Sequence, residues 1–467
     1  MSETHRPSKA YHFWNPYTPM DKLMPFMGIG PTVIVRGEGN YVINRYGKRY
    51  LNANSSTWNF TLGYGREEII EAANRQMREL AFSNCWGMVH PRAMELSTRL
   101  VEITSGNYAH VYLGANGSEV TESALKMARQ YFKQSPLHSE RERHKFISLR
   151  GSYHGLGFGA ISASGYDQYE VKFGPLLAGF VKIEPPYCYR CPYGKSGYPE
   201  CDLTCAQSLR AAIEQEGPET VAGFVMEPIM GEMGVIIPPS DYYRAVGEIC
   251  REYGVLFIVD EITTGFGRTG VLFVSQDWPI QPDLLCLGKI ISGGYAPLAA
   301  LLATEEIYQR FSGRGRYFIS GSTHSGHPVS AAIGLAAIDL ILKENLVENA
   351  ARVGAYLKTG LLELQKEHEI IGDVRCQGLM VAVELVKNRL TKEPFTEDEI
   401  FDYVLDVVER GVLISLDNLR FFPPLTINEG DADTILQALD GALHTGFLAN
   451  IDRKARLLRD FLESKIR

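Results

Sequence analysis

The chain has 467 residues, of which 45% are hydrophobic and 22% are charged, and its formal net charge is −8. A chain of this length can bury a large core and predicts about two domains. The mildly acidic charge argues against nucleic acid as a partner, and no apolar run is long enough to span a membrane. Because the first residues lack the apolar core of a signal peptide, we expect a cytoplasmic protein.

The N-terminal part of the chain is rich in aromatic residues and turn formers. Residues 33–35 and 41–44 are predicted to be short strands joined by a glycine-containing turn. Tyr17 and Trp58 stand in aromatic stretches on either side of these strands, where a place in the core and a place in a binding pocket fit the sequence equally well. Residues 67–80 then predict an amphipathic helix.

An anion-binding turn is predicted in the next part of the chain. Residues 110–114 predict a strand, and Gly117 and Ser118 open a helix that follows it. Small residues at a helix N-terminus can offer backbone N–H groups to a phosphate, at the positive end of the helix dipole. Without a ligand, the same turn would be an ordinary capped helix. Residues 145–149 predict the next strand, which leads to Tyr153 and the following histidine.

Four of the eight cysteines lie close together, in the order Cys188-x-x-Cys191-x9-Cys201-x-x-x-Cys205. This spacing could bind zinc, or disulfides could tie down an exposed insertion, taken here as residues 185–206. A loop of reduced thiols is the third alternative. Since cytoplasmic disulfides are unusual and the chemistry predicted below needs no metal, we predict no metal site and favour plain thiols or disulfides. Nothing in this segment is expected to be catalytic.

Two apolar runs, residues 255–259 and 284–287, each predict a buried strand that ends close to an ionisable residue. Asp260 follows the first run and Lys289 follows the second. Their separation of 29 residues (289 − 260) fits one strand-crossover-strand unit, so neighbouring parallel strands would bring a carboxylate and an amine to one crevice. A lysine in such a place can have a lowered pKa and attack a carbonyl, although a lysine at a surface turn is the commoner case.

A carboxylate beside such a lysine suits the ring nitrogen of pyridoxal phosphate, which binds to enzymes through a lysine. The block Asp260-Glu-Ile-x-x-Gly-Phe-Gly-Arg268, followed by Gly288-Lys289, resembles the class III aminotransferases, pyridoxal-phosphate enzymes of fold type I. The resemblance extends from about residue 14 to residue 425. It implies an α/β fold with a large, mostly parallel-sheet domain and a smaller α+β domain formed by the N- and C-terminal parts of the chain.

The resemblance also implies a set of cofactor contacts. The residues that would bind the cofactor are Gly117, Ser118, Tyr153, His154, Glu227, Asp260, Ile262, Lys289 and Thr323. Tyr153 would stack on one face of the ring and Ile262 would pack on the other, while the small residues at the helix start would hold the phosphate. Glu227 would lie near the phenolic side, and a structural role is favoured for His154. Thr263 stands where relatives often have glutamine, which leaves a contact with the phenolic oxygen open.

A homodimer with shared active sites, or a tetramer, is implied by the same resemblance. Thr323 would cross the interface to the cofactor phosphate of the partner, and Trp86 would reach toward the partner's active site. Tyr17 and Trp58 would line the substrate pocket.

One pair of charged residues resembles a substrate switch. Glu232 stands where ornithine- and aminobutyrate-aminotransferase-like relatives also have glutamate, and Arg420 precedes a Pro-Pro-Leu sequence as in those relatives. Arginine can hold a substrate carboxylate through two parallel hydrogen bonds, and the glutamate would neutralise it when the substrate has no carboxylate there. A fixed surface ion pair is the alternative.

We divide the chain into three parts. Residues 1–60 form an N-terminal segment of the small domain, residues 61–328 the large cofactor-binding domain with the cysteine insertion, and residues 329–467 the C-terminal small domain. A helix over residues 331–343 would link the domains. Strands are expected around residues 380–384 and 412–416, followed by an amphipathic helix from residue 432.

The resemblance implies a ping-pong aminotransferase that moves an amino group from an amine or ω-amino acid to pyruvate or 2-oxoglutarate. Lys289 would carry the cofactor and move a proton as general base and acid, and Asp260 would keep the ring nitrogen protonated. Racemases and a decarboxylase share this scaffold, so the fold alone does not fix the reaction. Diaminononanoate synthesis in the biotin pathway is the alternative transfer, because residues 12–17 and 54–58 resemble its N-terminal blocks.

Overall fold

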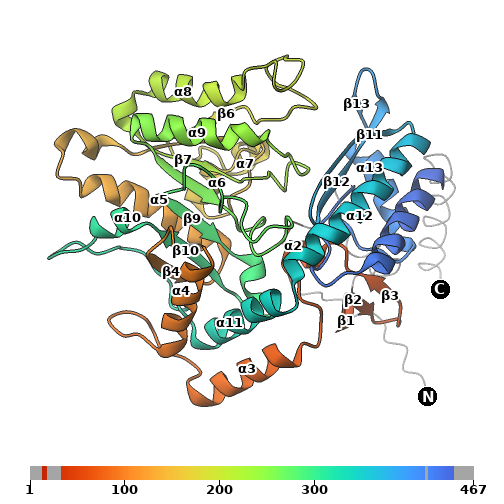
Figure 1. The fold of residues 1–467 in the computed structure, drawn as a ribbon, viewed down its shortest axis with the longest axis horizontal. Helices are drawn as coiled ribbons and strands as arrows, with labels where there is room; N and C mark the ends of the chain where they lie inside the picture. Colours follow the sequence, from red (N-terminus) through yellow and green to blue (C-terminus); the bar gives the residue numbers. More distant parts are fainter. Residues whose placement is uncertain (1–12, 18–32, 105, 416–418, 446–467) are drawn as a thin grey trace.

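The computed structural model describes residues 13–17, 33–104, 106–415 and 419–445. These residues form one large sheet covered by helices, with two smaller antiparallel sheets beside it (Figure 1). The α/β class predicted from the sequence is confirmed. No helix in these ranges is long and apolar enough to cross a membrane.

The large sheet has seven strands in the order β4-β10-β9-β8-β7-β5-β6. The strands are β4 (His110–Gly114), β5 (Lys145–Leu149), β6 (Phe180–Ile183), β7 (Val221–Met226), β8 (Leu256–Asp260), β9 (Leu284–Leu287) and β10 (Ala299–Ala303). Strand β10 runs antiparallel to both its neighbours, and the other neighbouring pairs are parallel. Since β8 lies beside β9, Asp260 and Lys289 leave the sheet at the same edge, as predicted.

Helices cover both faces of this sheet because its strands carry apolar side chains on both sides. In β8, the side chains of Phe257 and Val259 enter one core cluster, and the side chain of Ile258 enters another on the opposite face. The covering helices are α5 (Gly117–Lys133) on the face of Ile258 and α8 (Thr204–Glu216) and α9 (Ser240–Tyr253) on the other.

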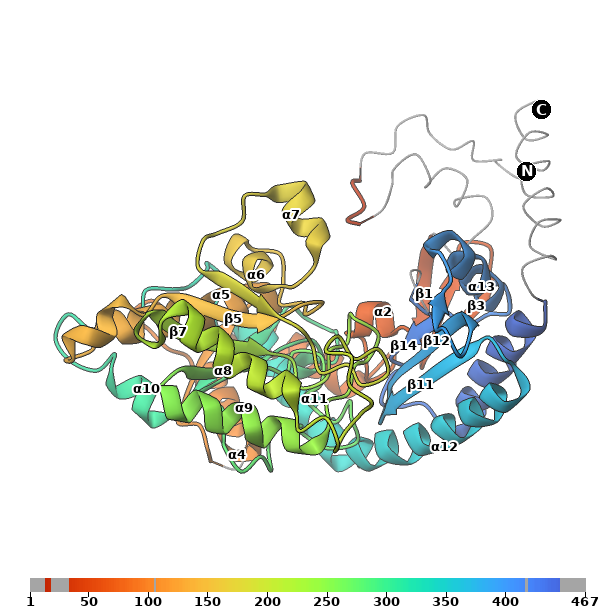
Figure 2. The ribbon, with the colours of Figure 1, turned by 90° about the horizontal axis from the view of Figure 1, so that it is seen from above.

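The remaining helices surround this core and extend toward the small sheets. They are α2 (Ser55–Trp58), α3 (Glu67–Glu79), α4 (Pro91–Ile103), α6 (Phe158–Ala163), α7 (Asp167–Phe173), α10 (Glu305–Gln309), α11 (Pro328–Lys343), α12 (Leu346–Glu367) and α13 (Glu397–Glu409). The residue range of α11 includes the predicted linking helix, residues 331–343. After a short turn, the chain continues into α12 on the side of the small sheets (Figure 2). In both ribbon views, α2 lies between the large sheet and the small sheets.

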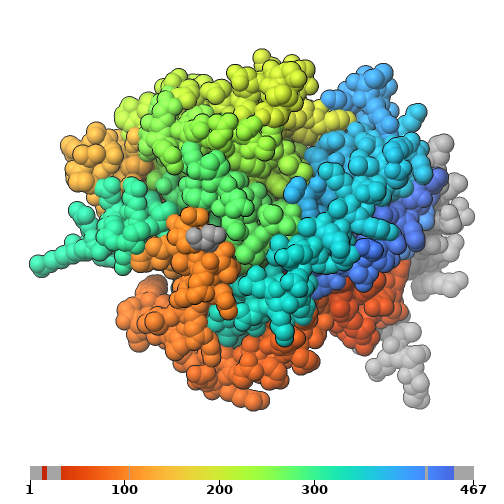
Figure 3. All heavy atoms as spheres, in the orientation of Figure 1, coloured from red at the N-terminus to blue at the C-terminus, as the bar shows by residue number. Residues whose placement is uncertain are grey.

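The two small sheets come from opposite ends of the chain. The N-terminal sheet contains β1 (Ile34–Glu38), β2 (Tyr41–Asn44) and β3 (Arg49–Leu51), and the C-terminal sheet contains β11 (Ile371–Gln377), β12 (Met380–Asn388), β13 (Glu393–Pro394) and β14 (Leu419–Phe421). Asp431 in the C-terminal helix that follows holds the N-terminal sheet, because its carboxylate accepts hydrogen bonds from Tyr41 Oη (2.8 Å) and Asn40 Nδ2 (3.0 Å). Figure 3 shows the N-terminal strands beside the C-terminal elements. The residue limits of the domains stay a prediction.

One predicted strand is wrong. Residues 412–415 form only an isolated bridge between Val412 and Leu51. The strand does not continue beyond this bridge in the described residues, and Ser415 N instead donates to Arg420 O (3.0 Å). Residue 416, the end of that prediction, and residue 12, the start of the N-terminal aromatic block, lie outside the described residues. The final helix is present over residues 429–445.

Candidate active site

Lys289 stands at the start of a short 3-10 helix, Lys289–Ser292, just after β9. Its φ of 44° lies in the left-handed region, a strained conformation that a residue with a side chain keeps only where its surroundings hold it. Lys289 Nζ donates a hydrogen bond to Thr263 Oγ1 at 2.6 Å. Burial lowers the pKa of the amine below its usual range, and the carboxylates of Asp260 and Glu227 offset only part of this effect. The amine is therefore suited to act as a nucleophile.

Asp260 is buried and held in one orientation. One carboxylate oxygen contacts His154 Nδ1 at 2.9 Å, and the other accepts a hydrogen bond from Ile262 N at 3.1 Å. His154 is buried as well, and its Nε2 has no hydrogen-bond partner in the described part of the chain. The ring of His154 therefore contacts Asp260 directly, so its position also affects this carboxylate.

Glu227 follows β7 and links the loops around the crevice. Its carboxylate accepts hydrogen bonds from Tyr153 N (3.0 Å) and Gly231 N (3.2 Å). Burial raises the pKa of this carboxyl, and the neighbouring Asp260 raises it further. Glu227 therefore positions both the backbone of Tyr153 and the loop that leads to Glu232.

The predicted anion-binding turn at the start of α5 lies close to the turn that contains Gly288 and Lys289. At the start of α5, Asn116 caps the helix by accepting a hydrogen bond from Glu119 N (3.0 Å), and Ser118 Oγ accepts one from Leu156 N (3.2 Å). A Cβ atom on Gly117 would lie 2.9 Å from Ile262 Cδ1, so a side chain would crowd Ile262 there. A Cβ on Gly288, the residue before the lysine, would lie 3.1 Å from the same side chain. Ile262 therefore separates the two turns by one side chain.

Trp58 belongs to the core and also lies close to the lysine. Its side chain is 4% exposed and packs on Phe422 with ring centroids 4.5 Å apart, and Lys289 Nζ lies 4.9 Å from its ring centroid. All four residues of α2, Ser55–Trp58, have positive φ, a strained turn for residues with side chains. Ser55 Oγ holds this turn by donating to Phe422 O at 2.6 Å.

Arg268 lies beside the tryptophan turn, a place that its sequence context did not predict. It is fully buried and donates to Trp58 O (3.3 Å) and to Pro423 O. It therefore holds the tryptophan turn against the segment that follows β14. No local pattern indicates this role, because Pro423 lies 155 residues further along the chain.

Glu232 and Arg420 meet beside Trp58. Arg420 Nη1 lies 3.4 Å from Glu232 Oε2 and donates to Gly231 O at 3.1 Å. The guanidinium carbon is 4.7 Å from the ring centroid of Trp58, whose ring also faces Lys289. Arg420 is only 2% exposed, whereas the side chain of Glu232 is 33% exposed, so the ion pair is partly buried.

A group of tyrosines lies near this pair. Tyr17 is 72% exposed, and its hydroxyl is 3.2 Å from the hydroxyl of Tyr169, which no sequence feature singled out. Burial raises the pKa of Tyr153, and the nearby Tyr17 and Glu232 raise it further. Tyr166 is also near Glu232, and its buried hydroxyl has no hydrogen-bond partner among the described residues. Tyr166 precedes α7 and Tyr169 lies in its first turn, where their spacing resembles ordinary core packing.

Two predicted residues lie on the surface of the single chain. Trp86 is 71% exposed, and Thr323 is exposed in a neighbouring loop. The two loops touch, because a Cβ atom on Gly321 would lie 3.4 Å from Trp86 Nε1. Their predicted place in the active site of a partner subunit stays a prediction.

These features fit pyridoxal phosphate. The buried amine of Lys289 suits its aldehyde, the fixed carboxylate of Asp260 suits its ring nitrogen, and the start of α5 suits its phosphate. An α/β sheet with this lysine and carboxylate at the ends of adjacent strands defines the protein as a pyridoxal-phosphate enzyme of fold type I. The chain belongs to the class III aminotransferases, since the family model "Aminotransferase class-III" matches residues 28–443.

Known proteins resemble the chain over almost all of its length. An adenosylmethionine-8-amino-7-oxononanoate aminotransferase of Geobacter sulfurreducens is 37% identical, with 95% of this chain and 98% of that protein covered. A taurine–pyruvate aminotransferase of Bilophila wadsworthia is 34% identical, with 89% and 92% covered. The crystal structure of a PLP-bound amine transaminase from an uncultivated Pseudomonas species matches with a TM-score of 0.89 and 35% identity, covering 94% of this chain and 99% of that one.

Proposed function

We propose that this aminotransferase moves an amino group from an amine or ω-amino acid to a keto acid, pyruvate or 2-oxoglutarate, by a ping-pong mechanism. One observation carries the proposal. The buried Arg420 is paired with Glu232 and stacked near the ring of Trp58, which also faces Lys289. Arg420 can bind a carboxylate, and Glu232 can neutralise Arg420 when no substrate carboxylate is present. Such a pair suits an enzyme that binds a keto acid in one half-reaction and an amine in the other.

The residues around the cofactor have separable tasks in this proposal. Bound pyridoxal phosphate supplies an aldehyde for the substrate amine and a ring that withdraws electrons from the reacting carbon. Lys289 holds the cofactor and, once displaced, carries the proton as general base and acid. Asp260, oriented by His154, keeps the ring nitrogen protonated. Thr263 takes the place of the family's glutamine, and its contact is with Lys289 Nζ.

Further contacts position the ring and its phosphate. Tyr153 and Ile262 pack on its two faces, Glu227 supports the phenolic side, and Gly117 with Ser118 binds the phosphate. Tyr17 and Trp58 line the substrate pocket.

The Glu232–Arg420 pair supplies dual selectivity in this proposal. A keto acid displaces Glu232 and binds the guanidinium through its carboxylate. An amine has no such group, so Glu232 then keeps the buried charge of Arg420 neutralised, which avoids the cost of an unpaired charge beside an apolar substrate.

A homodimer with shared active sites, or a tetramer built from it, is part of the proposal. Exposed apolar side chains gather on the loops around Trp86 and Thr323, and they include Met88 (58%), Val89 (64%), Tyr317 (66%) and Ile319 (66%). Large exposed apolar surfaces commonly bind another protein. Trp86 and Thr323 would then complete the active site of the partner. The cytoplasmic location inferred from the sequence also belongs to the proposal.

A second candidate is the formation of diaminononanoate. It is supported by the 37% identity to the Geobacter sulfurreducens relative. Racemisation or decarboxylation on the same scaffold is less favoured, since the relatives named above are aminotransferases.

A screen of donors and acceptors with product analysis tests the proposal. The donors are taurine, 1-phenylethylamine, an ω-amino acid and adenosylmethionine, and the acceptors are pyruvate, 2-oxoglutarate and 8-amino-7-oxononanoate. We expect amino transfer from an amine or ω-amino acid to pyruvate or 2-oxoglutarate. Transfer only between adenosylmethionine and 8-amino-7-oxononanoate would establish the second candidate and reject the first.

A further inference from the structure

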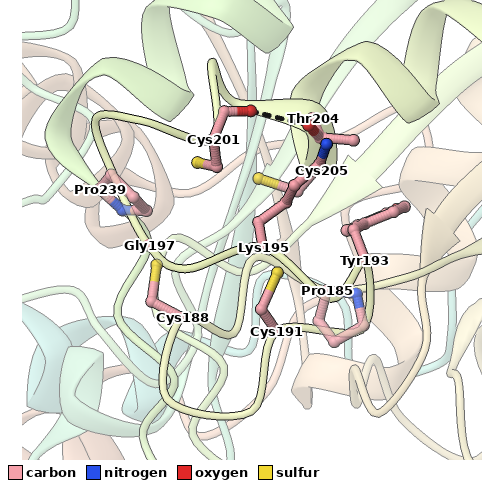
Figure 4. Close-up of a pocket in the computed structure, with 10 residues that line it drawn as sticks. All are labelled: Pro185, Cys188, Cys191, Tyr193, Lys195, Gly197, Cys201, Thr204, Cys205 and Pro239. Atoms are coloured by element: carbon pink, nitrogen blue, oxygen red, sulfur yellow. Dashed lines mark hydrogen bonds between the residues drawn. The ribbon is translucent and has the colours of Figure 1, made fainter.

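The cysteine insertion forms a pocket of its own. Its lining includes Cys188, Cys191, Cys201, Cys205 and Lys195, and none of the active-site residues described above (Figure 4). All eight cysteines, which lie within the described ranges, are free thiols, so the disulfides considered from the sequence are absent from the structure. Four thiols from two separate turns therefore surround one small space.

Local backbone structure brings the two cysteine pairs together. A turn after the first pair is closed by Gly194 N, which donates to Cys191 O at 3.1 Å. Between the second pair, Asp202 and Leu203 both have a φ of 48°, which reverses the chain and places Cys205 in the first turn of α8. Thr204 Oγ1 fixes this reversal by donating to Cys201 O at 2.7 Å. The start of a helix stabilises a thiolate through its positive dipole end.

The thiols also influence one another electrostatically. Burial raises the pKa of Cys188, and the neighbouring Cys201 and Cys191 raise it further. Burial raises the pKa of Cys205 to about 11, with added contributions from Cys201 and Cys188. Independently of these pKa values, both cysteine pairs line the same pocket.

We propose that Cys188, Cys191, Cys201 and Cys205 bind one Zn²⁺ ion as four thiolates. The C-x2-C and C-x3-C pairs match the spacing by which structural zinc sites draw two ligands from each of two turns. Each thiol gives up its proton to solvent as its Zn–S bond forms, and no oxidant or reductant is needed. Lys195 lies beside the resulting negative centre. Four protein ligands leave no open position, so the ion is structural, and this assignment replaces the sequence-based prediction of no metal.

Zinc would contract the insertion. No three of these sulfur atoms all lie within 4.8 Å of one another in the structure. A zinc ion with Zn–S bonds of about 2.3 Å holds its four sulfur atoms roughly 3.8 Å apart. The loops on both sides of the pocket must therefore close around the ion.

The cysteine insertion also contacts the small C-terminal sheet. Arg190 Nε lies 2.5 Å from Glu384 Oε1 on β12, so the insertion is fixed to the small C-terminal sheet. The other oxygen of Glu384 lies 2.7 Å from Arg375 Nη1, and Arg375 Nε donates to Gly234 O at 2.7 Å. Gly234 is two residues from Glu232. A metal in the insertion would thus stiffen the connection between the small sheet and the loop that carries the proposed switch.

A second cluster provides a control. His368, Asp440 and His444 also lie close together, but both rings contact the same carboxylate oxygen, at 2.8 and 3.0 Å. Two such ion pairs explain this cluster without a metal, and His444 is largely exposed.

Elemental analysis of the purified holoenzyme, produced without an affinity tag that binds metal, tests the proposal. We expect about one zinc per chain, and X-ray absorption at the zinc edge should show four sulfur neighbours at about 2.3 Å. Cys188→Ser and Cys201→Ser should each lose most of the zinc, and hydrogen exchange over residues 187–205 should become faster. The matched controls Cys85→Ser and His444→Gln should keep the zinc.

Several results would overturn the proposal. They are wild-type protein without stoichiometric zinc, iron with inorganic sulfide in place of zinc, a disulfide among the four cysteines, and zinc with nitrogen neighbours that is lost in His444→Gln. If the serine variants do not fold, the wild-type metal content and absorption spectrum still decide. None of these readouts depends on aminotransferase activity, so the proposal can fail while the proposed function stands.

Discussion

The two halves of the active site are assembled in different ways. Asp260 and Lys289 follow adjacent parallel strands of one sheet, so the register of β8 and β9 fixes their positions. Glu232 and Arg420 are 188 residues apart and belong to a loop after β7 and to β14 of the small sheet. The reactive groups are thus built into one rigid element, whereas the proposed selectivity exists only where two elements meet. Mutations should therefore separate reactivity from selectivity.

The largest effect is expected at the lysine. Lys289→Ala should abolish turnover and remove the absorption near ~420 nm that is typical of lysine-linked pyridoxal phosphate. Lys366→Ala, at an exposed lysine, is the matched control and should change neither property. An alanine variant at Lys289 that kept both the absorption band and activity would remove this residue from the mechanism.

The next effect is expected at the neighbouring strand end. Asp260→Asn should keep the cofactor bound but slow turnover by about 10²-fold or more, because the ring nitrogen loses the carboxylate that keeps it protonated. The slowing should appear in both half-reactions, since both use the same ring. Near-normal rates in this variant would show that Asp260 acts only in folding or binding.

A smaller and one-sided effect is expected where the two sheets meet. Arg420→Ala should weaken keto-acid binding by about 1.5–3 kcal/mol, the scale of a lost charged hydrogen bond, and spare the amine half-reaction. The two half-reactions are measured separately by cofactor absorbance, so the amine half is the internal control. Equal losses in both halves, or no loss with the keto acid, would reject the switch.

The same contrast explains how far the sequence could lead. The strands at residues 110–114 and 284–287 were predictable to the residue, because short apolar runs end sharply at glycine or polar residues. The pairing of β8 with β9 followed from the length of the connection between them. The position of β10 between β4 and β9 was not predicted. The order of elements along the chain does not show which two strands a later antiparallel strand will pair with.

Contacts between distant residues were the main omission. The left-handed turn of Ser55–Trp58 contains no glycine, so the sequence does not predict it. Hydrogen bonds from Ser55 to Phe422 O and from Arg268 to Trp58 O stabilise this turn. Arg268 is charged yet fully buried, which contradicts its ordinary surface preference. The carbonyl groups of Trp58 and Pro423 accept hydrogen bonds from this side chain, and both are more than 150 residues away in the sequence.

The most direct test of amino transfer is one half-reaction followed to completion. The holoenzyme is mixed with taurine or 1-phenylethylamine without any keto acid, and carbonyl product is measured against the ~420 nm absorbance of bound cofactor. The account predicts about one carbonyl product per active site as that absorbance disappears, and its return with formation of an amino acid when pyruvate or 2-oxoglutarate is added. Continued product release without a keto acid, or no change with any amine donor that is active in the screen, would contradict a ping-pong aminotransferase.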